Sequence, residues 1–133
     1  MLKKIPLVLF TISFTSFASE DVVTVDRYVK GGIEFSFPNE LNVQPALSEF
    51  KIEHFVLMSN ESGERWAVVT LTNQASGSRN LTNKQLMAQV ADGSRVSPTE
   101  FSQSFKANET LSLTMNFGHS EFPLLSVYSR PRN

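Results

Sequence analysis

The sequence predicts an all-β fold, an antiparallel β-sandwich of about seven or eight short strands. Apolar and polar residues alternate with a period of two in several segments, and this period places alternate side chains on one face of a sheet. Gly, Asn, Asp and Pro separate these segments, as turns between strands require. No segment sustains the helical period, so we expect at most a turn or two of helix. A small β-barrel is the alternative arrangement of the same strands.

The N-terminus has the organisation of a secretory signal peptide. Lys3 and Lys4 give it a positive start, residues 5–17 carry no charge, and Ser16-Phe17-Ala18 places small residues where a signal peptidase reads them. We expect cleavage after Ala18, with cleavage after Ser19 as the alternative. An uncleaved anchor is disfavoured, because a spanning helix needs about 20 apolar residues. The chain therefore divides into a signal peptide, 1–18, and a single domain, 19–133.

Charge and cysteine content restrict the location and partners of this domain. Two of the 12 basic residues lie in the leader, so ten remain against 13 acidic residues, a net charge of −3. No Lys/Arg cluster offers the basic surface that nucleic acid or anionic lipid binds, so we expect neither nucleic acid nor membrane insertion after processing. The chain has no cysteine, hence no disulfide. The short dilysine leader is typical of bacteria, which predicts the periplasm, with the external medium as the alternative.

Eight segments fit strands. The clearest is 110–117, where Leu111, Leu113, Met115 and Phe117 alternate with polar residues. Segments 51–59 and 64–73 are apolar on both faces, which is typical of central strands, and the loop 60–63 joins them as a hairpin. In chain order the expected strands are 22–29, 33–37, 51–59, 64–73, 85–90, 95–96, 110–117 and 124–128.

Turn residues support this division. Gly31-Gly32 follows the first segment and predicts a hairpin with 33–37, and Asp92-Gly93 predicts a tight turn between 85–90 and 95–96. Two segments are open. Residues 39–48 are irregular, with room for a helical turn. Residues 98–105 hold Phe101 and Phe105 four positions apart, which fits either one helical turn or an edge strand.

The order of these features resembles small immunoglobulin-like sandwich domains of bacterial extracytoplasmic proteins. The resemblance covers residues 64–128. It consists of a strand ending "VVTLTN" (68–73), the run "LMAQVADG" (86–93), the run "ANETLSLTMNF" (107–117) and a final aliphatic strand. The disulfide of antibody domains is missing. Such domains bind partners or serve as structural modules, and the resemblance implies no catalytic residue.

Patterns that carry chemistry are absent from the sequence. His54 and His119 are far apart in the chain, with no cysteine and no HxH or HExxH spacing, so we expect no metal or cofactor. No nucleophile elbow and no glycine-rich phosphate loop occurs. We therefore expect a protein that is not an enzyme. The remaining possibility for catalysis is a site assembled from distant residues.

Aromatic residues outside the regular strands are the candidates for binding. Trp66 and Phe55 belong to apolar strands and are expected in the core. Phe101, Phe105 and Phe122 lie in connections, where they either close the ends of the sandwich or contact a partner, since aromatics often dominate interfaces. Open edges at the N-terminal hairpin or at 124–128, which ends in Tyr128, could accept a strand of another protein. The partner-binding candidates are Phe101, Phe105, Phe122 and Tyr128.

These observations predict a periplasmic, non-enzymatic module that binds an envelope protein in signalling, secretion or an appendage. The alternative is a carrier for a sugar or an apolar molecule, which the number of aromatic residues motivates. The oligomeric state does not follow from the sequence.

Overall fold

A computed structural model describes residues 22–31 and 43–132 of the chain. The described residues form ten strands and one short 3₁₀ turn. The strands are β1 (Thr24–Lys30), β2 (Leu47–Ser48), β3 (Phe50–Ser59), β4 (Glu64–Asn73), β5 (Arg79–Thr82), β6 (Leu86–Val90), β7 (Arg95–Val96), β8 (Ser102–Phe105), β9 (Thr110–His119) and β10 (Leu124–Pro131). The 3₁₀ turn spans Asn83–Gln85. The predicted all-β class is confirmed.

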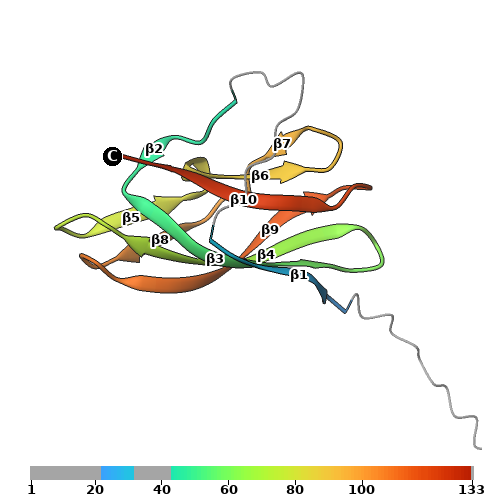
Figure 1. Cartoon of the computed structure of the whole chain (residues 1–133), viewed down its shortest axis with the longest axis horizontal. Coiled ribbons are helices and arrows are strands. Elements are labelled where there is room, and N and C mark those ends of the chain that lie inside the picture. Colours follow the sequence, from blue (N-terminus) through green and yellow to red (C-terminus); the bar gives the residue numbers. More distant parts are fainter. Residues whose placement is uncertain (1–21, 32–42, 133) are drawn as a thin grey trace, which may run out of the picture.

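The strands form two four-stranded sheets and a two-stranded ribbon. The first sheet has the order β1-β3-β4-β9, the second the order β2-β10-β6-β7, and the ribbon pairs β5 with β8. All neighbouring strands run antiparallel except β2, which lies parallel to the end of β10. In Figure 1, β10, β6 and β7 lie in the upper part of the view, β1, β3 and β4 below them, and the ribbon to the left.

The β3–β4 hairpin is the centre of the first sheet, and both strands match the prediction closely. Its loop closes through a bond from the Gly63 amide to the Asn60 carbonyl (3.1 Å), and Gly63 adopts a φ of +88°. The Asn60 side chain accepts the Glu64 amide at 2.9 Å. A short polar side chain and a glycine therefore make this turn, as the sequence predicts.

The predicted turn at Asp92-Gly93 is also confirmed. Gly93 has a φ of +91°, and its amide donates to the Val90 carbonyl at 2.9 Å. The preceding strand β6 does not have a clean alternation of buried and exposed residues, because Gln89, between Ala88 and Val90, is buried with 3% of its surface exposed. The side-chain Nε2 of Gln89 donates to the carbonyls of Gly93 and Ser94, at 3.3 and 3.4 Å, so the buried amide group has hydrogen-bond partners.

Several predictions of detail need correction. The described residues form ten strands where seven or eight are expected, and the additional strands are β2, β5 and β8. Residues 98–105 contain the strand β8 and not a helical turn, and the described part of 39–48 contains β2. No pattern in the sequence predicts β5, whose only apolar residue is Leu81. The expected signal peptide, the segment 33–37 and its hairpin with β1, and residues 39–42 lie outside the described residues.

One core joins the two sheets and the ribbon. Each of the following side chains is at least 94% buried, and together they form a single cluster. The first sheet contributes Val29, Phe50, Phe55, Leu57, Ala67, Val69, Leu71, Met115 and Phe117; the second Leu86, Ala88, Val90, Leu124 and Val127; the ribbon Leu81 and Phe105. Every buried polar side-chain atom in the described residues has a hydrogen-bond partner. Hydrophobic burial thus fixes which face of each sheet points inward.

Candidate functional site

The first sheet is apolar on its outer face as well as on its inner face. Phe55, Leu57, Ala67 and Val69 point into the core, so the residues that alternate with them point outward. Cross-strand neighbours share a face. The register therefore aligns Tyr28, Val56 and Val68 in one outward row, and Val25, Met58 and Trp66 in a second. We call these six residues the outer apolar face.

Exposure is concentrated where this face reaches the edge strand. Val25 is 64% exposed and Tyr28 57% exposed, while Val56, Met58, Trp66 and Val68 are half-buried. Four of the seven large hydrophobic residues exposed in the described part of the chain, Val22, Val23, Val25 and Tyr28, lie within 22–28. Contiguous apolar patches on a soluble protein are typical of interaction sites.

The rest of the outer surface of this sheet is polar. Thr70 and Ser112 share a hydrogen bond of 2.7 Å between β4 and β9, and Thr72 and Thr110 share another of the same length. At the other margin the ring of His54 lies 5.8 Å from that of Tyr28. The outer apolar face is thus confined to β1, β3 and the first half of β4.

The strand β1 also has an unpaired edge among the described residues. It pairs with β3 alone, and only Val29 of its seven residues is buried. Edge strands leave a row of backbone N–H and C=O groups that another strand can bind. Apolar side chains and free backbone groups therefore lie together on β1.

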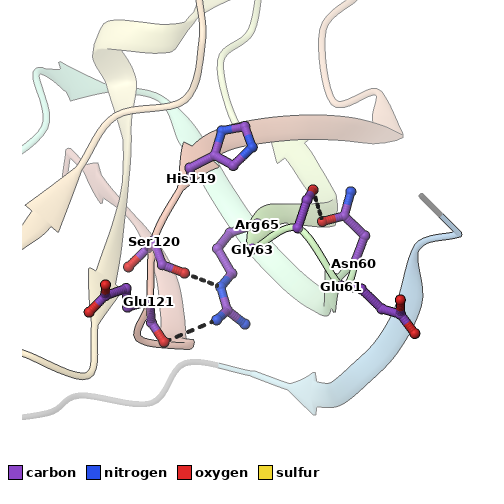
Figure 2. A pocket seen from close by; sticks show the side chains of 8 residues that line it. Asn60, Glu61, Gly63, Arg65, His119, Ser120 and Glu121 are labelled. Carbon is purple, nitrogen blue, oxygen red and sulfur yellow. Dashed lines mark hydrogen bonds between the residues drawn. The ribbon is translucent and has the colours of Figure 1, made fainter. Parts of the chain in front are cut away.

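A polar hollow of about 530 Å³ lies between the β3–β4 loop and the β9–β10 loop. Figure 2 shows Arg65 between the two loops, with Glu61 and Glu121 on opposite sides of it. The Arg65 guanidinium donates to the carbonyls of Ser120 (3.1 Å) and Glu121 (3.4 Å), and the Ser120 amide donates to the Gly63 carbonyl (3.0 Å). These bonds hold the two loops together, so Arg65 has a structural role here.

The two histidines lie apart and in different surroundings. His119 lies at the hollow, with its Nε2 3.8 Å from Glu64 Oε1, and Glu64 also accepts the Trp66 indole N–H at 3.2 Å. His54 contacts Tyr28 on the outer face. In the described residues, no three His, Cys, Asp or Glu side chains are placed to hold a metal ion. No described segment forms a helix with the length and hydropathy needed to cross a membrane.

The four aromatic candidates from the sequence are separated in the structure. Phe105 is 1% exposed and belongs to the core, so it is not available to a partner. Phe122 is 47% exposed in the β9–β10 loop. Tyr128 is half-buried, with the Arg95 guanidinium 5.5 Å from its ring centroid and its hydroxyl 3.7 Å from Met87 Sδ.

Phe101 is half-buried and packs against the core at a second hollow, of about 430 Å³. The other lining residues are polar: Thr82, Asn83, Lys84, Glu100 and Ser102. This hollow lies where β5 and β8 part, next to the last pair of the ribbon, Thr82 and Ser102. An aromatic residue and hydrogen-bonding groups thus line one depression.

Sequence reasoning missed the outer apolar face. Phe55 is fully buried, as predicted, but Trp66 is half-buried on the outer face and is not part of the core. The signal was present, because 51–59 and 64–73 are apolar on both faces. That pattern predicts a central position in the sheet. The position is correct, yet only one of the two apolar faces is covered by the second sheet.

Comparison with known proteins adds no further constraint: no family model, curated protein or solved structure matches this chain.

Proposed function

We propose that this chain is an exported, non-enzymatic module of the bacterial envelope that binds another protein through the outer apolar face. In this proposal the two sheets form an immunoglobulin-like β-sandwich that acts as a rigid support, and the mature protein resides in the periplasm. The sequence of the first 18 residues supports export. The observation that carries binding is the exposure of Val25 and Tyr28 beside half-buried Met58 and Trp66 on one sheet face.

The physical reason is that a sheet buries one face to fold, and apolar residues on the other face add much less to its stability while they stay in contact with water. Antiparallel sheets with one solvated face ordinarily alternate apolar and polar residues. Here the outward rows of β3 and β4 are Val56, Met58, Trp66 and Val68. Tyr and Trp are also the residues that most often dominate protein interfaces. A protein partner that covers this face would bury the second apolar surface.

Affinity capture tests the binding surface. The mature protein, attached through its C-terminus, is exposed to periplasmic extract, and captured proteins are identified by mass spectrometry. Tyr28→Thr and Trp66→Thr keep a residue that favours strands while removing the aromatic ring. Phe122→Thr is the matched control, because it removes an exposed aromatic residue that belongs to the β9–β10 loop and not to the outer apolar face. A partner lost with both face variants and retained by the control supports the proposal. A partner retained by all three contradicts it.

Export is tested separately by the mass of the protein recovered from the periplasm. Cleavage after Ala18 leaves a chain that begins at Ser19. A full-length mass, or recovery in the cytoplasm alone, would contradict the proposed location.

A carrier of a small ligand is the second candidate, and the hollow at Phe101 favours it. A sugar can stack its apolar face on an aromatic ring and bond its hydroxyls to groups such as Asn83 and Glu100. A bound sugar or apolar molecule should raise the melting temperature of the wild-type protein. Phe101→Ala should abolish that increase and Phe122→Ala should preserve it. An unchanged melting temperature across a panel of sugars and apolar metabolites removes this candidate.

A further inference from the structure

The free edge of β1 has a charge order that complements a second copy of itself. Asp26 and Arg27 are adjacent, exposed and of opposite sign. Arg27 makes no hydrogen bond or ion pair with any residue of the described chain, whereas Asp26 accepts a bond from Ser59 Oγ at 2.8 Å. Charges on an edge strand usually prevent pairing. Adjacent opposite charges instead favour pairing of two identical strands in antiparallel orientation, because each charge then lies beside the opposite charge of the other strand.

A bulge in β1 gives these charges and their apolar neighbours a definite geometry. Val25 lies opposite Met58 and Tyr28 opposite Val56, so both belong to the outer apolar face, although they are three positions apart. Three positions would put them on opposite faces of a regular strand. The extra residue between Val25 and Arg27 restores them to one face.

We propose that this protein forms a two-fold symmetric dimer in which β1 pairs antiparallel with β1 of a second copy. The two-fold axis passes between Asp26 and Arg27, perpendicular to the sheet. This symmetry sets Val25 opposite the partner's Tyr28, and Asp26 beside the partner's Arg27, each pair occurring twice. Symmetric pairing of this kind preserves the face of every side chain, and the bulge is what makes Val25 and Tyr28 compatible with it.

The dimer joins the two outer apolar faces into one surface. The combined sheet has eight strands, with the two copies of β1 at its centre and the hydroxyl pairs of β4 and β9 toward its ends. Cross-strand apolar and opposite-charge pairs both favour such pairing. A single pair of strands buries less surface than a standard interface, so we expect a reversible dimer with a dissociation constant on the order of 10–100 µM.

This inference goes beyond the proposed function and is tested without any other protein. The mass of the purified mature protein is measured by sedimentation equilibrium up to about 1 mM, well above the expected dissociation constant. The wild-type protein should pass from monomer to dimer with concentration. In a dimer of Asp26→Arg, or of Arg27→Asp, residues 26 and 27 that face each other across the two-fold axis carry the same charge. Each variant alone should therefore remain monomeric. Lys106→Asp, the same charge change as Arg27→Asp on an exposed turn, should dimerise as the wild type does.

Mixing the two variants tests whether these charges meet across the dimer. A chain with Arg at positions 26 and 27 complements a chain with Asp at both positions, so an equimolar mixture should recover a dimer that contains one of each. The double variant Asp26→Arg/Arg27→Asp should also dimerise. A folding defect in either single variant could not produce this recovery.

Three results would overturn the proposal: a wild-type protein that stays monomeric, single variants that dimerise as well as the wild type, or a mixture that stays monomeric. A hairpin between β1 and residues 33–37, as the sequence predicts, would occupy the same edge and give the first of these results. Loss of the dimer would leave the capture experiment interpretable through Trp66→Thr, which lies outside the β1 pairing, whereas Tyr28→Thr lies within it.

Discussion

Phe50 and Phe105 meet edge to face, with their ring centroids 4.9 Å apart and their planes inclined by 64°. Phe50 begins β3 and Phe105 ends β8, so this contact fixes the ribbon against the first sheet. Both side chains are 1% exposed. Edge-to-face aromatic pairs are favourable because the positive edge of one ring meets the negative face of the other.

Phe105→Ala should therefore lower the free energy of unfolding by about 3–5 kcal/mol, the usual cost of removing a buried phenylalanine. Urea unfolding of the mature protein, followed by circular dichroism, measures this. Phe105→Leu should lose less, and Phe122→Ala, at an exposed position, should stay within about 0.5 kcal/mol of the wild type. A double-mutant cycle with Phe50→Ala should give a coupling of about 0.5–1.5 kcal/mol. A cost below about 1 kcal/mol for Phe105→Ala would show that Phe105 is not buried in solution.

The strands whose bounds the sequence predicts best are those where the apolar pattern and the turn residues agree. The predicted ends of 64–73 are correct, because the turn residues Asn60 and Gly63 bound one end and the apolar run is long. Strand β5 was missed because Leu81 is its only apolar residue and its position depends on pairing with β8. Local sequence contains little information about a strand whose pairing partner, and not its own pattern, defines it.

The candidate site was predicted less well, for a related reason. Alternation says that Trp66 and Val68 share a face, but not which face the second sheet covers. That choice depends on how β10 and β6 pack over β3 and β4, which involves residues far apart in the chain. For the same reason the sequence leaves Phe105 open between closing an end of the sandwich and contacting a partner, since its contact with Phe50 is long-range.

Asn73 is a buried polar residue on which three backbone groups depend. It is fully buried at the end of β4; its Nδ2 donates to the carbonyls of Gly77 and Lys106, both at 3.0 Å, and its Oδ1 accepts the Ala75 amide at 3.0 Å. Asn73→Ala leaves these groups without partners. Each group that water does not reach should lower the free energy of unfolding by about 1–3 kcal/mol. We expect a loss of at least about 2 kcal/mol in urea unfolding. Gln74→Ala, at the exposed neighbour, is the control, and equal stability of the two variants would contradict this role.

Gly63 and Gly77 differ in how strongly the backbone conformation requires glycine. Gly63 has a φ of +88°, and a Cβ there would lie 3.4 Å from the Ser120 carbonyl oxygen. Gly77 lies outside the positive-φ region, and a Cβ there would meet only the end of the flexible Arg79 side chain. Gly63→Ala should therefore cost about 1–2 kcal/mol from the left-handed backbone alone, and Gly77→Ala should cost less. Thermal unfolding of the two variants compares them directly, and the opposite order would argue against the conformation of the β3–β4 loop.

Asp92 links stability to acid pH through the β6–β7 turn. The Ser94 hydroxyl donates to Asp92 Oδ1 at 2.6 Å and the Ser94 amide donates to the same oxygen at 2.9 Å. Both bonds lower the pKa of Asp92 below its ordinary value of 3.8, and the bond from the hydroxyl is the larger cause. A carboxyl whose pKa is lower when folded stabilises the protein above its unfolded pKa, and this contribution is lost as the pH falls through the folded pKa.

Asp92→Asn should therefore be less stable than the wild type at neutral pH, and the difference should shrink below about pH 4 as Asp92 becomes protonated. Ser94→Ala removes the largest cause of the shift, so the pKa of Asp92 should rise toward 3.8 in this variant. Carboxyl carbon chemical shifts, followed by NMR through an acid titration, measure the pKa in both proteins. Because Asp92 lies on the surface, the expected effect on stability is small and the titration is the more decisive measurement. A wild-type Asp92 that titrates at or above 3.8, or one that Ser94→Ala leaves unchanged, would refute the role of the serine.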